Sequence, residues 1–451
     1  MKARIHSRQL RARALVYFVS LSLLGALALS LTTTRAQPDL NFQRERGRVM
    51  LKVIKDELKK EYYDPNFHGM DLEARFNAAA EKIKEAESVG HLFGIIGQAM
   101  LDLNDSHTFF LPPSRANRTE YGWKMQAVGD KVFVSAVKPG SDAEKKGVKV
   151  GDQVLSLHGF QPSREALWKL TYMFYALRPQ PGLRVVLQSP EGQQRQLDAM
   201  ANVKQGKAML DFTSSMRGDF FDFLRELEEE DRMDRQRYVE VGDSLFIWKM
   251  PTFGTSDQAV EDVMRKARKH EALILDLRGN PGGYVSTLQW FMGYFFDKEI
   301  KIADLKGRKE MKPQTSQPHR DRNFKGKLIV LVDSRSASAA EIFARVVQLE
   351  KRGVVIGDRT AGAVMQSRAF GHLLGEGSGV IYGASITNAD VIMADGKSLE
   401  GVGVTPDELL LPTAADLAAN RDPVLARAAA MAGFELPPDK AGAMFPVEWR
   451  K

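Results

Sequence analysis

The chain has 451 residues, enough for two or three domains with a sizeable core. Its hydrophobic fraction of 43% and charged fraction of 27% are those of an ordinary globular protein, which excludes wholesale disorder. The net charge of +7 is a mild excess, and no basic stripe is interleaved with aromatic residues, so the composition argues against nucleic-acid binding.

The N-terminus carries the pattern of an export signal. Five cations precede an apolar run from Ala14 to Leu31, and Thr34 and Ala36 follow at the small-residue positions of a cleavage site. We therefore expect residues 1–36 to be a signal peptide, with a single membrane anchor as the alternative. Because the chain has no cysteine, it forms no disulfide and carries no lipid on a thiol.

Residues from about 41 to 99 have a helical period. Apolar residues recur at spacings of three and four in VMLKVIKDELKKEYY and LEARFNAAAEKIKEAESV. The stretch YYDPNFHGMD between them predicts a turn, with Pro65 and Gly69 as helix breakers. This helical segment ends in LDLNDSHTFFLPP.

Between about 121 and 200 the period changes to that of short strands. KVFVSAV predicts a strand, PGSDAEKKG a turn and short helix, and LRVVLQSP a later strand after a helix near 165–176. Together with GDQVLSLHG (151–159), this order resembles a PDZ domain, in which His158 is a turn residue. The resemblance implies that Tyr121, Gly122 and Trp123 form the loop that binds a chain terminus, although the Gly-Leu-Gly-Phe pattern is absent.

The charged stretch from Phe220 to Val241 favours a solvated helix, with an interaction arm as the alternative. From about residue 238 onward, strands alternate with helices. SLFIWKMP, ALILDLRG, KLIVLVDS and VVIGDRTAG predict strands, whereas VSTLQWFMGYFF and SAAEIFARVVQLEKRG predict helices. Apolar strands joined by helices indicate an α/β domain with a largely parallel sheet.

The stretch DSRSASAAEIFAR places three serines where a strand meets a helix. Ser338 followed by Glu341 fits a capping box, which is the ordinary explanation of a serine at this position. Catalytic groups also gather at strand ends in α/β domains, so a nucleophilic serine is the alternative.

A glycine-rich turn, RGNPGG, follows the strand ALILDL. Its backbone N–H groups, free of side chains, are suited to an oxyanion or a phosphate, and a plain structural turn is the alternative. It is neither a P-loop nor a GxGxxG motif. We expect Arg278 and Asn280 to brace the turn.

The order of these motifs resembles the C-terminal processing and tricorn-type serine peptidase family. DLRGNPGG, LVDSRSASAAEIFA, VVIGDRTAG and LEGVGVTPD follow one another as in that family, after LNDSHTFFLPP and the PDZ-like insertion. The resemblance implies a multidomain α+β fold, with a crotonase- and ClpP-like α/β protease core, an inserted PDZ-like domain and a helical N-terminal segment. It makes Ser338 the nucleophile and leaves Ser334 and Ser336 as turn and packing residues.

The resemblance also bears on the general base. Tail-specific members use a lysine in Thr-x-Gly-Lys-Gly, but Ala363 stands at that position here. The tricorn-type branch uses a histidine after a serine, with a glutamate near the C-terminal end. In this chain those residues correspond to Ser106, His107 and Glu400, and the oxyanion would be bound by the N–H of Ala339 and that of Gly282 or Gly283.

The family reading implies polypeptide substrates, no cofactor and no nucleic acid, with homo-oligomerisation left open. Membrane association is expected only if the N-terminal segment is retained, and the protein is otherwise expected in the periplasm or outside the cell. The other histidines show no metal-ligand spacing, so no metal is expected. A catalytically silent binding protein and a crotonase-like acyl enzyme are the rival functions.

The expected organisation has six parts. They are a signal peptide (1–36), a helical segment with Ser106-His107 (37–117), a PDZ-like domain (118–203), a charged helical linker (204–237), the peptidase core (238–415) and a helical tail (416–451).

Overall fold

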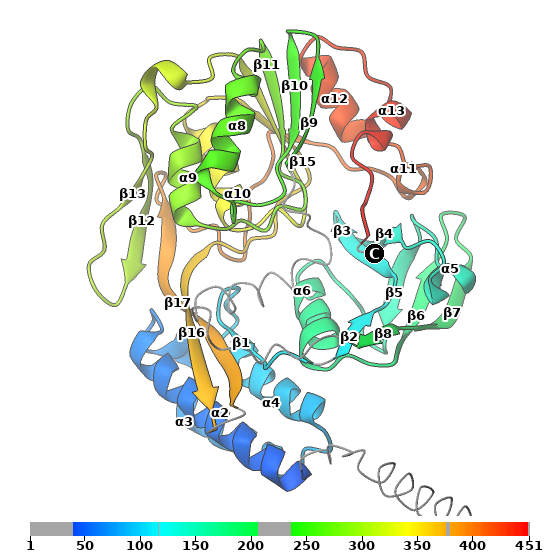
Figure 1. The fold of residues 1–451 in the computed structure, drawn as a ribbon, viewed down its shortest axis with the longest axis vertical. Coiled ribbons are helices and arrows are strands. Elements are labelled where there is room, and N and C mark those ends of the chain that lie inside the picture. The colour runs from blue at the N-terminus through cyan, green and yellow to red at the C-terminus, as the bar shows by residue number, and fades with distance from the viewer. Residues whose placement is uncertain (1–38, 116, 206–235, 376–378, 450–451) are drawn as a thin grey trace, which may run out of the picture.

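The computed structural model describes residues 39–115, 117–205, 236–375 and 379–449. It has four parts: N-terminal helices, a small β module, an α/β core and a C-terminal tail (Figure 1). The expected signal peptide and most of the charged linker lie outside the described residues. Within the described residues, no helix is long and apolar enough to cross a membrane.

Three helices form the N-terminal part, as the helical period predicts. They are α2 (Leu40–Glu61), α3 (Leu72–Lys84) and α4 (Val89–Leu101), with a short 3-10 turn at Phe67–Gly69. Each longer helix begins at a side-chain cap, provided by Asp39, Asp71 and Ser88 respectively. Their apolar faces pack together and against the strand that contains Tyr382 and Ile386.

The inserted module, defined here as residues 118–203, contains a five-stranded antiparallel sheet with its own core. Its strand order is β3-β4-β5-β6-β7. The strands are β3 (Trp123–Val128), β4 (Lys131–Val137), β5 (Gln153–Leu157), β6 (Gly182–Gln188) and β7 (Gln194–Met200), with β2 (Asn117–Glu120) paired to β8 (Asn202–Gln205). The helices are α5 (Asp142–Lys145) and α6 (Leu167–Thr171), the latter continued by a π-helical turn, Tyr172–Leu177. His158 has a φ of 52°, in keeping with its expected place in a turn.

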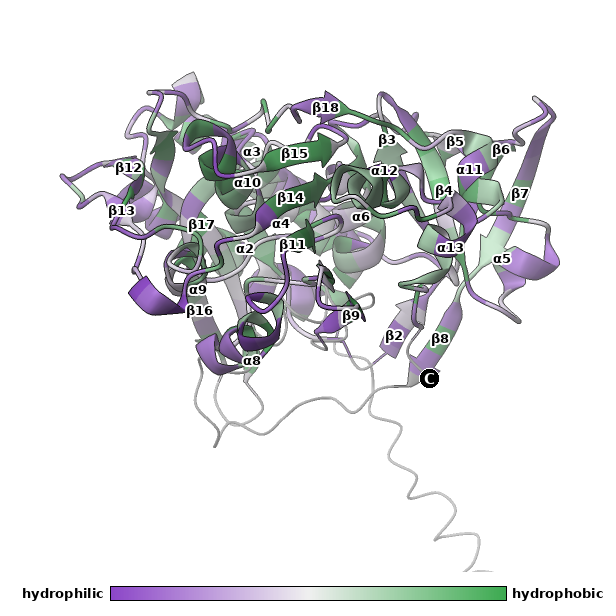
Figure 2. Ribbon diagram, turned by 90° about the horizontal axis from the view of Figure 1, so that it is seen from above, coloured by the Kyte–Doolittle hydropathy of each residue, from purple (hydrophilic) through white to green (hydrophobic). Residues whose placement is uncertain are grey.

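The α/β core is built on a six-stranded sheet in the order β18-β15-β14-β11-β10-β9, parallel except at β9. Its strands are β9 (Arg237–Val241), β10 (Leu245–Lys249), β11 (Ala272–Asp276), β14 (Lys327–Val332), β15 (Val354–Gly357) and β18 (Glu408–Leu409). The hydrophobic colouring of β11, β14 and β15 in Figure 2 reflects their burial on both faces. The predicted, largely parallel sheet is therefore correct.

Helices cover both faces of this sheet. On one face lie α8 (Asp257–Ala267), α9 (Val285–Met292) and α10 (Ala339–Leu349), and on the other lie α12 (Pro423–Met431) and α13 (Pro438–Ala443). Successive residues of β11 alternate between the two cores, with Leu273 in the first and Ile274 in the second. A short helix, α11 (Ala414–Ala418), precedes the tail.

A second, antiparallel sheet joins the N-terminal part to the core. It contains β1 (Phe109–Leu111), β12 (Lys301–Gly307), β13 (Gln314–Thr315), β16 (Met365–Leu374) and β17 (Val380–Met393). β1 pairs with β17, so that Phe109 lies opposite Ser385. This pairing brings the residues just before β1 to the edge of the core.

Two expectations about element boundaries are wrong. The helix expected over 285–296 ends at Met292, and its C-cap residue Gly293 packs so closely on the Gln317 carbonyl that no larger side chain fits there. The charged helix expected to reach Val241 gives way to strand β9, which pairs with β10. β9 lies at the edge of the sheet, where its pairing with β10 and the alternating RYVEV pattern favour a strand.

Candidate active site

The loop between β14 and α10 presents Ser338 in a constrained backbone conformation. Ser338 has a φ of 53° and a ψ of −120°, although a non-glycine residue rarely adopts a positive φ. It stands at the N-cap of α10, and its Oγ lies 3.4 Å from Nε2 of His107. A strained backbone conformation costs free energy and persists only where the surrounding structure enforces it. Residues of this kind cluster at functional sites.

Glu341 fixes the position of Ser338 by accepting a hydrogen bond from its backbone N–H. One oxygen of its fully buried carboxylate accepts from the N–H groups of Ser338 (3.1 Å) and Ala363 (2.9 Å). The other accepts from the N–H of Gly362 (2.8 Å) and the hydroxyl of Thr360. Burial raises the pKa of Glu341 to about 7, although these four donors favour its charged form. The reach of Glu341 back to Ser338 fits the predicted capping box.

His107 is held by a chain of hydrogen bonds on its far side. Its Nδ1 lies 2.7 Å from Ser106 Oγ, and that hydroxyl donates to Glu400 Oε2 at 2.9 Å. Because the single hydroxyl proton of Ser106 goes to the carboxylate, Nδ1 of His107 has to be the donor. Nε2 is then left with a lone pair facing Ser338, as a general base requires. Burial lowers the pKa of His107, and the charge of Asp105 opposes this only in part.

Glu400 follows β17 and reaches across to the N-terminal segment. Its carboxylate also accepts from the N–H groups of Ser106 (2.9 Å) and Val364 (2.8 Å). Burial raises its pKa, while the bonds from Val364 and Ser106 oppose that rise. Three segments far apart in the sequence therefore meet at His107.

The glycine turn lies beside Ser338. The N–H of Gly282 is used within the turn, where it donates to Oδ1 of Asn280 at 2.8 Å. The N–H groups of Gly283 and Ala339 have no acceptor within the described residues. A Cβ on Gly282 would lie 2.7 Å from Cβ of Ser338 and 2.8 Å from Ala339 N, so only glycine leaves this space open.

Arg278 and Asn280 brace the turn, as expected. Arg278 forms ion pairs with Asp276 and Asp422, and Asn280 donates to the carbonyl of Met250 at 3.1 Å. The carbonyl of Asn280 accepts from Ala337 N at 2.9 Å, which ties the turn to the nucleophile loop.

Ala363 occupies the place where the tail-specific pattern has a lysine. Its carbonyl accepts from the N–H of Ser338 at 2.9 Å. Across the described ranges, no lysine side chain is hydrogen-bonded to Ser338, and the base that contacts its hydroxyl is His107. The other two serines of the loop have structural contacts: Ser334 Oγ donates to the Ala127 carbonyl and Ser336 Oγ to that of Leu277.

The three module residues named as a terminus-binding loop are placed differently from one another. Tyr121 and Trp123 are each 2% exposed and belong to the module's core. The Tyr121 hydroxyl lies within hydrogen-bond distance of the carbonyl oxygens of Phe174 (3.2 Å) and Gln180 (3.0 Å), either of which can accept its proton. Gly122 has a φ of 72° and borders a surface cavity. Only backbone groups of this loop could therefore meet a ligand.

Sequence reasoning missed two residues that position the site. Asp105 accepts from the backbone N–H of His107 (2.8 Å) and from the Thr387 hydroxyl (2.7 Å), and both Asp105 and Thr387 are buried. The only signal was that Asp105 directly precedes Ser106-His107. In the part of the chain that the structure describes, no group of three or more His, Cys, Asp or Glu side chains could hold a metal ion.

Comparison with known proteins identifies the family that the α/β core matches. The model of peptidase family S41 matches residues 247–410, which include Ser338, Glu400 and the glycine turn. The chain carries a peptidase family S41 domain. The chain is 25% identical over 324 residues to the tail-specific protease of Haemophilus influenzae. It is also 25% identical over 338 residues to carboxyl-terminal-processing peptidase 1, chloroplastic, of Arabidopsis thaliana. The expected resemblance to C-terminal processing peptidases is confirmed.

The matches extend beyond the S41 domain itself. They cover 66% and 70% of this chain, but only 42% and 62% of the two relatives. Among solved structures, mature CPAF aligns with a TM-score of 0.62 at 15% identity, over 84% of this chain and 94% of that one. This alignment confirms the expected fold class of an α/β protease core within a multidomain α+β chain.

Proposed function

We propose that this S41 chain is an exported serine endopeptidase that cleaves polypeptides, with Ser338 as the nucleophile and His107 as the general base. The observation that carries the proposal is the continuous series of contacts from Glu400 through Ser106 and His107 to Ser338. Nucleophile, base and orienting groups are the arrangement that acyl transfer requires.

In the proposed mechanism, Ser338 Oγ attacks the scissile carbonyl carbon while Nε2 of His107 accepts the hydroxyl proton. Ser106 and Glu400 keep the imidazole oriented and stabilise its positive charge. His107 then gives the proton to the leaving amine. A water molecule next attacks the carbonyl carbon of the acyl-enzyme while His107 accepts a proton from it, and His107 returns that proton to Ser338 Oγ as the acyl group leaves. Because burial lowers the pKa of His107, the imidazole is neutral at pH 7 and ready to accept a proton.

The oxyanion would be bound by the N–H groups of Gly283 and Ala339. Neither group has an acceptor within the described residues, and Ala339 lies at the start of α10, whose N-terminal end adds positive potential. Each such donor contributes about 3 kcal/mol to transition-state stabilisation. Gly282, the other residue considered from the sequence, has its N–H engaged by Asn280.

The inserted module and the N-terminal segment supply the rest of the proposal. The module's antiparallel sheet, with edge strand β3 and the loop at Gly122, supports a PDZ-like role in recruiting polypeptides. The signal pattern in residues 1–36 supports export to the periplasm or the extracellular side. Cleavage near substrate C-termini is suggested by the processing peptidases that the chain resembles.

The test is covalent labelling of the full chain by a fluorophosphonate, together with cleavage of an unfolded protein. Wild type should label and cleave, Ser338→Ala should do neither, and His107→Ala should lose at least about a hundredfold in rate. Ser334→Ala, in the same loop, is the matched control and should label normally. A wild-type chain that neither labels nor cleaves would overturn the proposal.

A catalytically silent binding protein is the second candidate. The distance of 3.4 Å between His107 Nε2 and Ser338 Oγ favours it, because a productive hydrogen bond spans roughly 2.6–3.2 Å. Sites without substrate often show such loosening, however. If the wild-type chain binds unfolded polypeptides but is not labelled, and His107→Ala behaves identically, the protein is a catalytically silent binding protein.

A further inference from the structure

The segment after α13 leaves the core and crosses to the inserted module. We call residues 444–449 the strap. Phe445 packs on the same core cluster as α12 and α13, and the carbonyl of Pro446 accepts from Arg237 Nη1 at 2.9 Å. Figure 1 shows the chain then running to the module beside β3 and β4.

The strap meets the module through an aromatic ring. The indole of Trp449 lies over the ammonium of Lys124, with Nζ 4.0 Å from the ring centroid, and Lys138 Nζ lies 6.0 Å from the same centroid. Lys124 belongs to edge strand β3, and Lys138 directly follows β4 and pairs with Glu120. Both distances are within the range of cation–π attraction, for which tryptophan is the strongest partner.

This contact borders the loop that was expected to bind a chain terminus. A surface cavity of about 360 Å³ lies beside it, lined by Tyr121, Gly122, Lys138 and Ser141 among others. Lys138 thus belongs both to the cavity wall and to the surface under Trp449. We call Lys124, Lys138 and this cavity the module's docking face.

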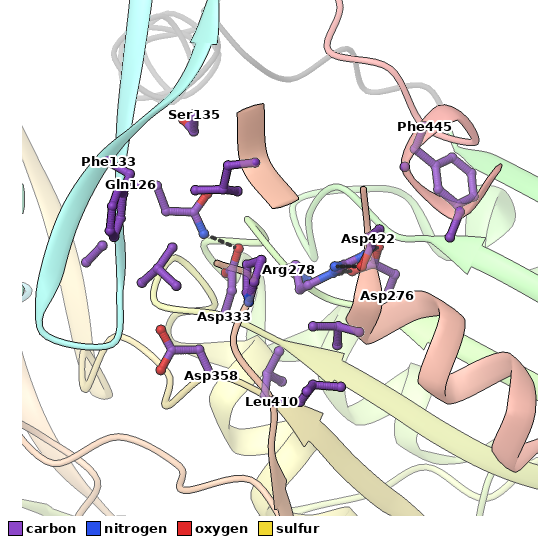
Figure 3. A pocket seen from close by; sticks show the side chains of 18 of the residues that line it. Gln126, Phe133, Ser135, Asp276, Arg278, Asp333, Asp358, Leu410, Asp422 and Phe445 are labelled. Atoms are coloured by element: carbon purple, nitrogen blue, oxygen red, sulfur yellow. Dashed lines mark hydrogen bonds and ion pairs between the residues drawn. The ribbon is translucent and has the colours of Figure 1, made fainter. Parts of the chain in front are cut away.

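The strap also lies at the junction between module and core. A second cavity, of about 230 Å³, is lined by Phe445 from the strap, Gln126 and Phe133 from the module, and Asp333 from the nucleophile loop (Figure 3). Gln126 Nε2 donates to Asp333 Oδ2 at 2.7 Å, the dashed line between them in the figure. The module therefore touches the loop that carries Ser338 beside a cavity that the strap helps to line.

We propose that the docking face takes an aromatic side chain from an extended polypeptide segment, and that the chain's own strap occupies it in cis through Trp449. This inference rests on the proposed recruiting role of the module and names the kind of segment it recruits. The two lysines select an electron-rich ring, and the strap has to leave before another polypeptide is bound there.

The test measures binding and needs no cleavage. A fluorescein-labelled peptide with residues 443–449 (AMFPVEW), blocked at both ends, is titrated by anisotropy into full chains that carry Ser338→Ala. Adding Trp449→Ala should tighten binding about 5- to 30-fold, the range that loss of one cation–π competitor allows. A peptide with alanine in place of tryptophan should bind neither chain.

Two further variants keep the outcome unambiguous. Val447→Ala is the matched control, because Val447 lies in the strap with 53% of its surface exposed and should leave affinity unchanged. Lys124→Met, added to the Trp449→Ala chain, should weaken binding about 5- to 30-fold, and Trp449→Leu replaces Trp449→Ala if that chain melts early. Equal affinity with and without Trp449, or no binding to the Trp449→Ala chain, overturns the inference. Because Ser338 is absent throughout, the result is independent of peptidase activity.

Discussion

At the scale of single residues, the site depends on the carboxylate of Glu341, which is buried and accepts several hydrogen bonds. Glu341 receives four donors and contacts no substrate atom in the proposed mechanism, so it acts as a positioning residue for Ser338. Burying a carboxylate costs free energy unless donors compensate it, and here burial is the larger effect.

The raised pKa of Glu341 makes stability depend on pH in a defined direction. Its pKa is about 7 in the folded chain and 4.5 ordinarily, so folding takes up a proton between these values. The stabilisation is complete below pH 4.5 and disappears as pH rises through 7, a change of up to about 3 kcal/mol. Glu341→Gln should remove this part of the pH dependence in urea titrations. It should also slow labelling of Ser338, because the amide turns a donor toward backbone N–H groups.

Glu350→Gln is the control for this prediction. Glu350 is an exposed carboxylate at the C-cap of the same helix, so its replacement should leave the pH profile of stability as in wild type. If Glu341→Gln retains the wild-type slope between pH 4.5 and 7, Glu341 does not titrate as described.

Some residues of the site could be identified from the sequence, and others could not. Ser338, His107 and Glu400 stand in motifs whose order along the chain resembles the S41 peptidases, and the structure brings them together. Asp105 and Thr387 lie 282 positions apart in the sequence and come together only in the tertiary fold. No local sequence pattern therefore identifies them as residues of the site.

At the scale of elements, the pairing of β1 with β17 delivers His107 to the core. Phe110 at the centre of β1 is fully buried opposite Ala384. The hydroxyl of Thr108 donates to Thr387 Oγ1 (3.1 Å), and Thr387 N donates to Thr108 Oγ1 (3.0 Å). The base is therefore positioned by a strand of three residues and a few buried polar groups.

Thr387→Val tests this arrangement with almost no change of shape. It removes the hydroxyl that donates to Asp105, and an unsatisfied buried group costs about 1–3 kcal/mol. We expect slower fluorophosphonate labelling in a folded chain, measured with circular dichroism as the check on folding. Thr387→Ser retains the hydroxyl and should restore the rate. Labelling of Thr387→Val at the wild-type rate would show that Asp105 does not position His107.

Whether a strand could be predicted from the sequence depends on its residue pattern and its length. Strands β11 and β14 are continuous apolar runs and were predicted from sequence, whereas β16 and β17 were not. β16 mixes glycine, histidine and arginine with apolar residues and is paired only with β17, so its period is weak. β1 is too short to be identified without its partner.

At the scale of the whole molecule, one arginine joins the glycine turn to the C-terminal tail. Arg278 donates to both oxygens of Asp276 and to both oxygens of Asp422, which caps helix α12 through Leu425 N. Burial alone would raise the pKa of Asp276, but the charges of Arg278 and Lys249 lower it overall. The tail that carries the strap is thus anchored at the glycine turn.

Arg278→Met should destabilise the chain and disturb the site together. Removing one partner of a buried ion pair leaves uncompensated carboxylates and costs about 3–5 kcal/mol. Arg278→Lys should recover only part of this, because one ammonium cannot replace a guanidinium that bridges two carboxylates. The free energy of unfolding in urea and the rate of Ser338 labelling measure the two effects.

The matched control is Arg421→Met, which removes a half-exposed pair with Asp416 at 2.7 Å in the same tail. An exposed pair contributes at most about 1 kcal/mol, so this variant should unfold and label almost as wild type does. If the two methionine variants lose equal stability, the buried network does not anchor the tail. If Arg278→Met unfolds early but the folded chain labels at the normal rate, the turn holds its shape without the tail.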